Sequence, residues 1–176
     1  MSSPSPGRRH LLLAAGALPL LPGCAPAEVQ GFAAWADATR ALQALGADAR
    51  TRGGWSLAQV LEHAAQSIEY SIDGYPVLKS AVFRGTVGAA AWAVFDARGR
   101  MSHALDEPIP GAPALTLALG AARERLLAAM ARYAAHTGPL APHFAYGPLD
   151  KAQYARAHLM HLANHWTEVQ PAGAPR

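Results

Sequence analysis

The sequence predicts an all-α protein, a four-helix bundle with an irregular, partly helical crossover between the second and third long helices. Hydrophobic residues make up 51% of the 176 residues and charged residues only 15%, which is typical of a compact chain. Apolar side chains recur at three- and four-residue steps in four long segments, as expected for helices with one buried face. No alternating strand pattern, internal repeat or glycine-rich phosphate loop is evident in the sequence.

The first two helices have recognisable boundaries. Residues 32–46 carry apolar side chains at helical spacing, and Gly46 is the expected end of this segment. A second helix is expected to start after Ser56, whose hydroxyl can cap it, with Gln59 completing a capping box three residues later. Gly74 and the proline that follows shortly after it are expected to end this helix.

The second half of the chain contains a less regular segment between two further helices. Residues 78–113 fit one helical stretch interrupted by Gly85 and Gly88, followed by a proline-rich connection. A third long helix is predicted over residues 115–136, and a last one over residues 150–169 with a capping box at its start. Residues 78–113 therefore form the expected crossover within one domain.

Residues 1–27 have the layout of a secretory signal peptide, and residues 28–176 are expected to form one domain. A polar, basic start precedes an apolar run over residues 11–21, and small residues follow. The run of about 11 residues is shorter than the roughly 20 that a membrane-spanning helix needs. Arg8 and Arg9, just before the run, resemble a twin-arginine export signal. We therefore expect an exported protein, either periplasmic or attached to a membrane.

Two processing sites compete at the end of this segment. The letters LPGC, which end at Cys24, resemble a lipoprotein box, in which an acylated Cys24 would anchor the mature chain to the membrane. Ala25 to Ala27 form an A-x-A cleavage signal that would release a protein beginning at Glu28. An uncleaved helix in a cytoplasmic protein is the third alternative. Cys24 is the only cysteine, which excludes a disulfide or a cysteine-based zinc site within one chain.

Three histidines fall on one narrow arc of the last predicted helix. His161 and His165 are one helical turn apart and can bind the same metal ion, and His158 and His161 could do so as well. His158 and His165 are separated by two turns, about 10.5 Å, so one ion is not expected to use both. His63, on the second predicted helix, is the best candidate for a third ligand. On spacing alone, a polar helix face remains the alternative.

Other polar residues near the predicted site carry weaker expectations. Tyr70 and Glu62 share a helix with His63 and are candidates for proton transfer, although each also fits a solvated helix face. The remaining histidines of the mature domain lie in loops or at a helix end and are expected to be surface residues: His103, His136 and His143.

Two segments carry a resemblance to a known family. WSLAQVLEHAAQSIEY and HFAYGPLDKAQYARAHLMHLANHW, residues 55–70 and 143–166, resemble the DinB-like superfamily of metal-binding four-helix bundles, in a branch known only as a domain of unknown function. The resemblance covers nearly all of the presumed mature chain. It implies a metal triad of His63, His161 and His165.

The chain departs from that branch at two places near the last ligand. Asn164 stands where the branch often has a second histidine, and Thr167 and Glu168 stand where it often has a glutamine. Neither departure removes a ligand of the implied triad. Both change the polar groups around it, so the chemistry of the pocket does not follow from the resemblance.

The implied site predicts a divalent metal ion with open coordination positions. Three neutral imidazoles are the ligand set of catalytic zinc sites, and they also suit nickel, copper and iron; zinc or nickel is expected. The sequence therefore predicts a metal-dependent hydrolase or transferase that acts on an unknown small molecule. The alternative is a non-enzymatic envelope or metal-binding protein. A homodimer is a further expected state, whereas the net charge of +3, without a run of Lys or Arg, disfavours nucleic-acid binding.

Overall fold

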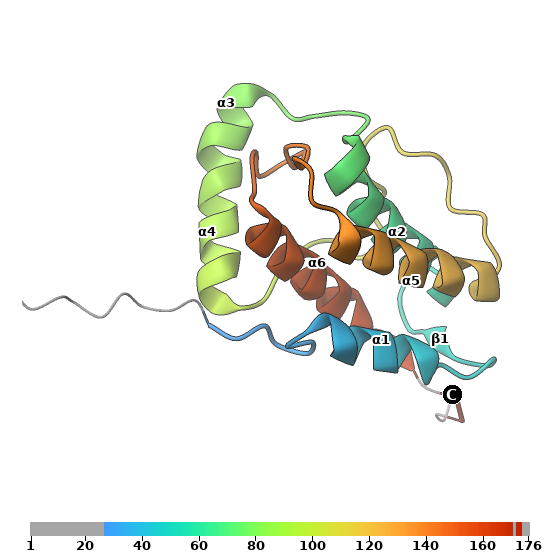
Figure 1. The fold of residues 1–176 in the computed structure, drawn as a ribbon. Coiled ribbons are helices and arrows are strands. Elements are labelled where there is room, and N and C mark those ends of the chain that lie inside the picture. The colour runs from blue at the N-terminus through green and yellow to red at the C-terminus, as the bar shows by residue number, and fades with distance from the viewer. Residues whose placement is uncertain (1–26, 171, 174–176) are drawn as a thin grey trace, which may run out of the picture.

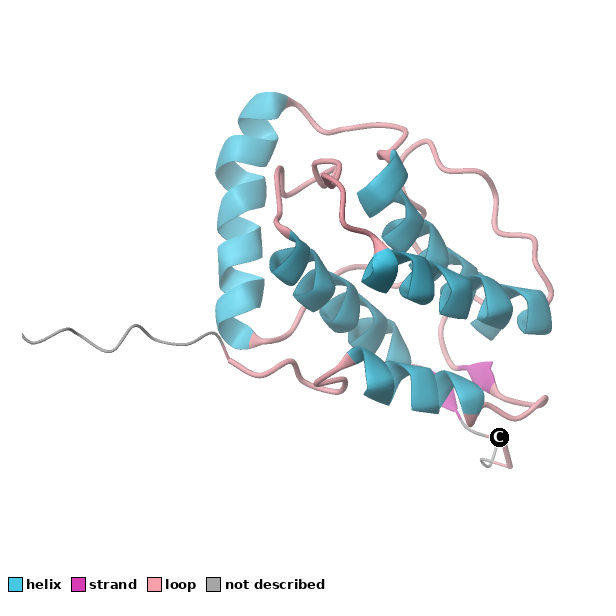
Figure 2. Ribbon diagram, in the orientation of Figure 1, coloured by secondary structure: helices cyan, strands magenta, loops and turns pink. Residues whose placement is uncertain are grey.

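The computed structural model describes residues 27–170, 172 and 173, so Arg8, Arg9 and Cys24 of the proposed export segment lie outside the described residues. The described part is mostly helical, with one small two-stranded sheet (Figure 1, Figure 2). Within it, no helix is both long enough and apolar enough to cross a membrane.

The helices follow the predicted order, and a π-helical segment and a pair of short strands are added to them. The helices are α1 (Trp35–Gln43), α2 (Leu57–Asp73), α3 (Ala81–Phe83), α4 (Ala89–Arg98), α5 (Leu119–Ala135) and α6 (Lys151–Trp166). A π-helical segment, η1 (Arg84–Gly88), connects α3 to α4, and the strands are β1 (Arg50–Thr51) and β2 (Val169–Gln170).

Helices α2 and α5 form the closest helix pair and run in the same direction. Two ion pairs show this direction. Arg125 pairs with Glu62 in the first half of α2, and Arg132, later in α5, pairs with Asp73 at the end of α2. Between them lies a core of small and aliphatic side chains, in which Leu61 is 0% exposed. Helix α6 and part of α1 pack on the same core, so α2 has α5 on one side and α6 on another.

Both predicted capping boxes are present. The Ser56 hydroxyl accepts a hydrogen bond from the backbone N–H of Gln59, and the Gln59 side chain accepts one from the backbone N–H of Ser56. Asp150 and Gln153 make the same exchange at the start of α6. Caps of this kind contribute about 1 kcal/mol each. They define the starts of the two helices that carry the predicted ligands.

The first part of the crossover is one continuous helical segment, in which Gly85 and Gly88 do not end the helix but lie in the π-helical turn η1 between α3 and α4. The segment passes from α3 through η1 into α4 (Figure 1). Gly88 is buried against the turn at residues 143–147, where a Cβ would overlap the carbonyl oxygen of Ala145. Gly85 has no neighbour within 4 Å of such a Cβ. Close backbone approach therefore explains Gly88 but not Gly85.

Replacing Gly88 with alanine is expected to lower stability by about 2 kcal/mol, because the added methyl group must displace the turn that contains Ala145. For a chain of this size, that loss corresponds to a fall in Tm of roughly 4 to 8 °C. The matched control is Gly85→Ala in the same helical segment, which should leave Tm unchanged or raise it, since alanine favours helices. Differential scanning calorimetry of both variants tests this, and equal Tm values for the two would contradict the assigned contact.

The small sheet was not expected from the sequence. Strand β1 pairs antiparallel with β2, with Arg50 opposite Gln170 and Thr51 opposite Val169. Strands of two residues are too short to show alternation, and the strict all-α prediction therefore missed them. The sheet pairs the segment that follows α6 with the segment that precedes α2. This pairing brings Trp55 close to the ends of both helices.

Candidate metal centre

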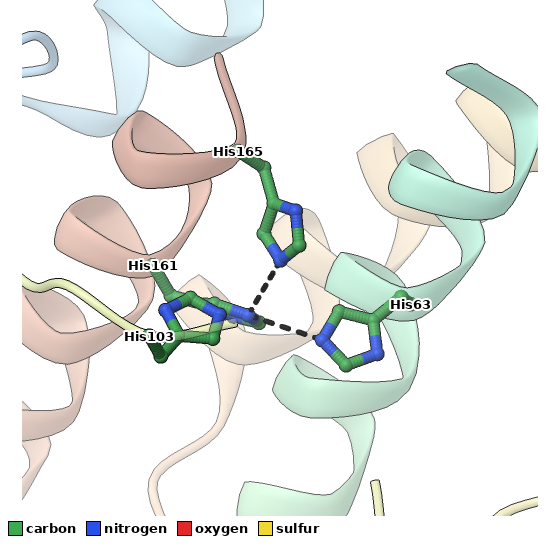
Figure 3. A group of neighbouring side chains, drawn as sticks. All are labelled: His63, His103, His161 and His165. Carbon is green, nitrogen blue, oxygen red and sulfur yellow. Dashed lines mark hydrogen bonds between the residues drawn. The ribbon is translucent and has the colours of Figure 1, made fainter. Parts of the chain in front are cut away.

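Four histidines converge between α2, α6 and the irregular connection after α4 (Figure 3). Each offers one ring nitrogen, and these nitrogens all lie within 4.8 Å of one another. Nε2 of His161 is 3.1 Å from Nε2 of His63 and 3.1 Å from Nε2 of His165. The structure thus places the three predicted ligands together and adds His103 to them.

Helical geometry explains three of these positions. His161 and His165 are one turn apart on α6, so their side chains leave the same face of the helix. His63 faces them from α2, and the ring centroids of His63 and His165 are 5.2 Å apart. Trp55 covers the group from outside, with its ring 5.0 Å from the ring of His63. The cluster is therefore shielded on the side where α2 begins.

His103 corrects the expectation that it is a surface residue. It lies half-buried in the connection between α4 and α5, with its ring centroid 4.8 Å from that of His161. The side-chain amide of Asn164 contacts its Nδ1 at 2.7 Å, and its Nε2 is buried without a hydrogen-bond partner among the described residues. No local pattern around His103 could have revealed this, because a long irregular loop brings it to the site.

Asn164 can orient His103 as a ligand. The two ends of an asparagine amide are assigned from the hydrogen-bond network, so either one can face Nδ1 of His103. If the carbonyl oxygen faces Nδ1, it accepts the Nδ1–H hydrogen and leaves a lone pair on Nε2. An outer partner of this kind fixes both the tautomer and the ring position of a metal ligand. Asn164, which departs from the family branch near the last ligand, thus contacts a histidine of the cluster directly.

Burial keeps all four imidazoles neutral at pH 7. It lowers the pKa of His63 and of His103 from 6.5 to about 4, with a smaller contribution at His63 from the neighbouring His103. Burial, followed by repulsion from His63 and His103, lowers the pKa of His165 to about 3. The pKa of His161 is lowered well below 6.5, first by burial and then by repulsion from the other three cluster histidines and from His158. Each ring therefore keeps an unprotonated nitrogen that can bind a cation.

The cluster opens onto a cavity of about 450 Å³, within the usual size range of small-molecule sites. His63, His103 and His161 lie in its wall. The other walls come from the connection after α4 and from the turn at residues 143–147, and they are largely apolar: Met101, Ile109, Phe144 and Tyr146. A ligand in this cavity would contact the apolar walls and the histidines at the same time.

Among the described residues, two further buried histidines lie outside the four-histidine cluster. His158 packs between Tyr133 and Tyr154, at 5.3 Å from each ring, so it does not join His161 and His165, as the two-turn separation predicted. His143 is only 8% exposed, and its surface assignment is therefore wrong. It lines the cavity on the side of the 143–147 turn.

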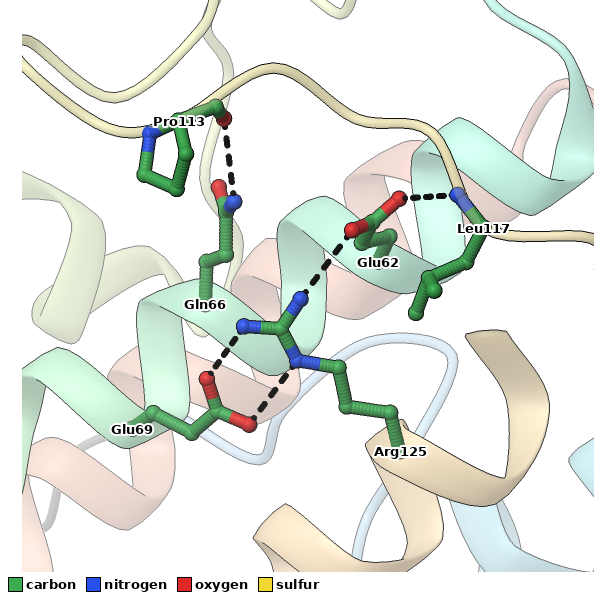
Figure 4. A network of polar contacts seen from close by, with 6 residues as sticks. All are labelled: Glu62, Gln66, Glu69, Pro113, Leu117 and Arg125. Atoms are coloured by element: carbon green, nitrogen blue, oxygen red, sulfur yellow. Dashed lines mark hydrogen bonds and ion pairs between the residues drawn. The ribbon is translucent and has the colours of Figure 1, made fainter. Parts of the chain in front are cut away.

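Glu62, a candidate for proton transfer, binds an arginine instead, and so does Glu69 on the same helix (Figure 4). Glu62 is 3% exposed and accepts hydrogen bonds from Arg125, at 3.0 Å, and from the backbone N–H of Leu117, at 2.9 Å. Glu69 binds the same guanidinium through both of its oxygens. Gln66 donates to the carbonyl of Pro113, so this face of α2 holds the crossover and α5 in place.

Tyr70 also lies apart from the histidines. Its ring packs 5.7 Å from the ring of Tyr75, and neither Tyr70 nor Glu62 is part of the cavity wall. Ser67, one turn after His63 on α2, does line the cavity. Ser67 is therefore, besides His63, the polar residue of α2 that borders the cavity.

The sequence of the chain matches one known protein family. Residues 28–172 match the model of a family described as a protein of unknown function, DUF1569. The protein belongs to this family. The match agrees with the resemblance to a domain of unknown function, while membership of the DinB-like superfamily stays a prediction. Searches among curated proteins and among solved structures found no match.

Proposed function

We propose that this DUF1569 protein binds one divalent metal ion through His63, His161 and His165, with His103 as a fourth donor, and acts as a metal-dependent hydrolase or transferase. The observation that carries the proposal is the approach of four imidazole nitrogens to within 4.8 Å of one another beside a cavity. Two pairs of these nitrogens lie 3.1 Å apart, and Nε2 of His103 has no hydrogen-bond partner among the described residues, whereas one cation could bind all four neutral rings at once.

The donor set fits such an ion. Nε2 of His103 is buried without a protein partner and belongs to the residue that completes the cluster. No Asp, Glu or Cys joins the group among the described residues, so the ligands are neutral and an ion would keep its full charge. Zinc and nickel both accept imidazole ligands. A bound ion of this kind lowers the pKa of coordinated water and polarises oxygen atoms of a ligand.

With a fourth histidine as a ligand, the coordination number of the ion decides whether the site can bind a substrate. Four protein ligands close a tetrahedral site, which is typical of structural zinc and would favour a non-enzymatic metal-binding protein. A five- or six-coordinate ion would keep positions for water or substrate. Because His63, His103 and His161 all border the cavity, such positions would face it. The apolar walls then select the substrate, and the Ser67 hydroxyl can hydrogen-bond to a ligand beside His63.

Three further features belong to the same proposal. Helices α1, α2, α5 and α6 form a four-helix bundle of the DinB-like kind, supported by the shared core on which all four pack. Residues 1–27 export the protein to the periplasm, either with a lipid on Cys24 that attaches it to the membrane or as a free protein. Its substrate is a small molecule, and a homodimer is its proposed assembly.

Cobalt substitution tests both the site and its openness. Purified full-length protein, stripped with a chelator, should take up about one equivalent of Co²⁺ with the visible absorption of a histidine-ligated ion. Adding azide should then change that spectrum, because a small anion can enter from the cavity. Uptake below about a tenth of an equivalent would contradict the metal site. Full uptake with an azide-insensitive spectrum would instead support the non-enzymatic alternative.

A further inference from the structure

The cavity wall formed by the turn at residues 143–147 contains a histidine with a defined tautomer. Nδ1 of His143 accepts hydrogen bonds from the backbone N–H groups of Ala145 and Tyr146, each at 3.1 Å. A nitrogen that accepts two N–H groups must keep its lone pair. In a neutral ring, the single hydrogen is therefore on Nε2. This argument requires no metal, because it uses backbone donors alone.

The ring is also held in position on several sides. It stacks on Tyr146 with 4.2 Å between centroids and 4° between planes, and the edge of Tyr75 contacts it from another direction. The backbone of His143 pairs with Gly147 through two hydrogen bonds, so the turn is closed at its base. Helix segment η1 packs on the same turn through Gly88. Nε2 is thus presented by a rigid element.

Nothing in the described structure uses the hydrogen on Nε2. His143 makes hydrogen bonds to described residues only through Nδ1, and its ring lines the cavity together with His63, His103 and His161. Burial, with a smaller contribution from His158, lowers the pKa of His143 to about 3, so the ring stays neutral at pH 7. An N–H group that borders a largely apolar cavity gains free energy when a ligand oxygen accepts its hydrogen.

We propose that His143 is the ligand-orienting residue of the cavity, which binds an apolar small molecule whose oxygen acceptor receives the Nε2–H hydrogen. The apolar part of the molecule would pack on Met101, Ile109 and Phe144. The wall also contains one cation, Lys79, and one anion, Glu107, whose opposite charges offset each other. The acceptor is therefore recognised by hydrogen bonding, and both a carboxylate and an uncharged amide carbonyl satisfy it.

Nuclear magnetic resonance of the full-length protein tests the tautomer without any ligand. A long-range ¹⁵N–¹H correlation spectrum at pH 7 should show the His143 ring with its hydrogen on Nε2. The spectrum should be the same in chelator-treated and zinc-loaded protein, so a failure of the metal proposal leaves this test intact. A hydrogen on Nδ1, or a doubly protonated ring, would overturn the inference.

Binding of two matched probes tests the ligand class. Phenylacetate and phenylacetamide carry the same apolar ring with an oxygen acceptor, and both should shift the His143 Nε2–H signal. Phenethylamine, which has no acceptor oxygen, should not. Binding of neither oxygen-bearing probe to the wild-type protein, or an equal shift with phenethylamine, would contradict the proposal.

Two variants test whether binding depends on the hydrogen-bond donor of His143 and not only on an aromatic ring at this position. His143→Phe keeps an aromatic ring against Tyr146 but removes the donor, and it should weaken binding of both oxygen-bearing probes about tenfold or more. His136→Phe, at the end of α5 and outside the cavity wall, should bind them as the wild type does. Unchanged affinity in His143→Phe would overturn the proposal. If that variant does not fold, the ring spectra of the wild type still decide it.

Discussion

Replacing His161 with alanine is expected to reduce bound divalent metal from about one equivalent per chain to less than about a tenth. His161 is the central member of the cluster, since its Nε2 lies 3.1 Å from the corresponding nitrogens of both His63 and His165. Its ring is also the nearest of the α6 rings to His103. Replacing it removes the one nitrogen that contacts both His63 and His165 at 3.1 Å. Metal analysis after dialysis against zinc or nickel measures the loss directly.

His158 provides the control on the same helix. It lies on the same arc of α6, one turn before His161, but packs against Tyr133 and Tyr154 and does not belong to the cluster. His158→Phe, which keeps a planar ring in that aromatic setting, should retain the full metal content. Loss of metal in His158→Phe, or full binding by His161→Ala, would mean that the ion uses a different set of histidines. The comparison therefore tests the choice between neighbouring pairs on one helix.

The metal-free protein is expected to unfold in mildly acidic solution, between about pH 6 and pH 4. Burial lowers the pKa of His143 and of His158 from 6.5 to about 3, and that of His63 to about 4. The unfolded chain binds protons at these histidines as the pH falls below 6.5, while the folded chain excludes them. Stability present above pH 6.5 is therefore lost as the pH falls toward the folded pKa values.

The size of this effect follows from the same values. A fully buried histidine such as His158 costs on the order of 3 kcal/mol of stability between pH 6.5 and pH 4. Only a few such groups are needed to offset the roughly 5 to 15 kcal/mol that stabilises an ordinary domain. Far-UV circular dichroism followed against pH in the presence of a chelator measures the transition. A metal-free protein that stays folded at about pH 4 would contradict the expected linkage.

Two comparisons identify the groups responsible. Zinc should shift the transition to lower pH, because an ion that binds only the folded chain stabilises it and competes with protons for the same nitrogens. His158→Phe should shift it in the same direction without metal, because it removes one buried base whose protonation favours unfolding. Zinc acts at the cluster and His158→Phe acts outside it, so the two shifts should add.

Local sequence patterns predicted the parts of the site that depend on helical geometry. His161 and His165 were identified because a four-residue spacing places two side chains on one face of a helix. The start of α2 at Ser56 and that of α6 at Asp150 were predicted because each capping residue bonds a backbone group three positions away. Each of these features is decided within about one helical turn of chain.

His63 lies 98 positions from His161; it was the best third-ligand candidate because it stands on a predicted helix, and the resemblance to a known family supported that choice. The structure then showed that Glu62, the residue beside it, faces the other way and binds Arg125. Neighbours on a helix point in directions about 100° apart, so one can enter a site while the next enters an ion pair. Proximity in sequence was therefore a poor guide to which carboxylate could act on a substrate.

The sequence by itself determined the helices, their capped starts and the histidine pair on α6, because these depend on contacts between residues a few positions apart. Only the tertiary structure decided that His103 joins the cluster and that His143 faces the cavity, since both lie in irregular segments without periodicity. Their positions depend on long-range contacts: Asn164 contacts the ring of His103, and Gly88 lets the turn after His143 approach η1. Local propensity contains no information about such contacts.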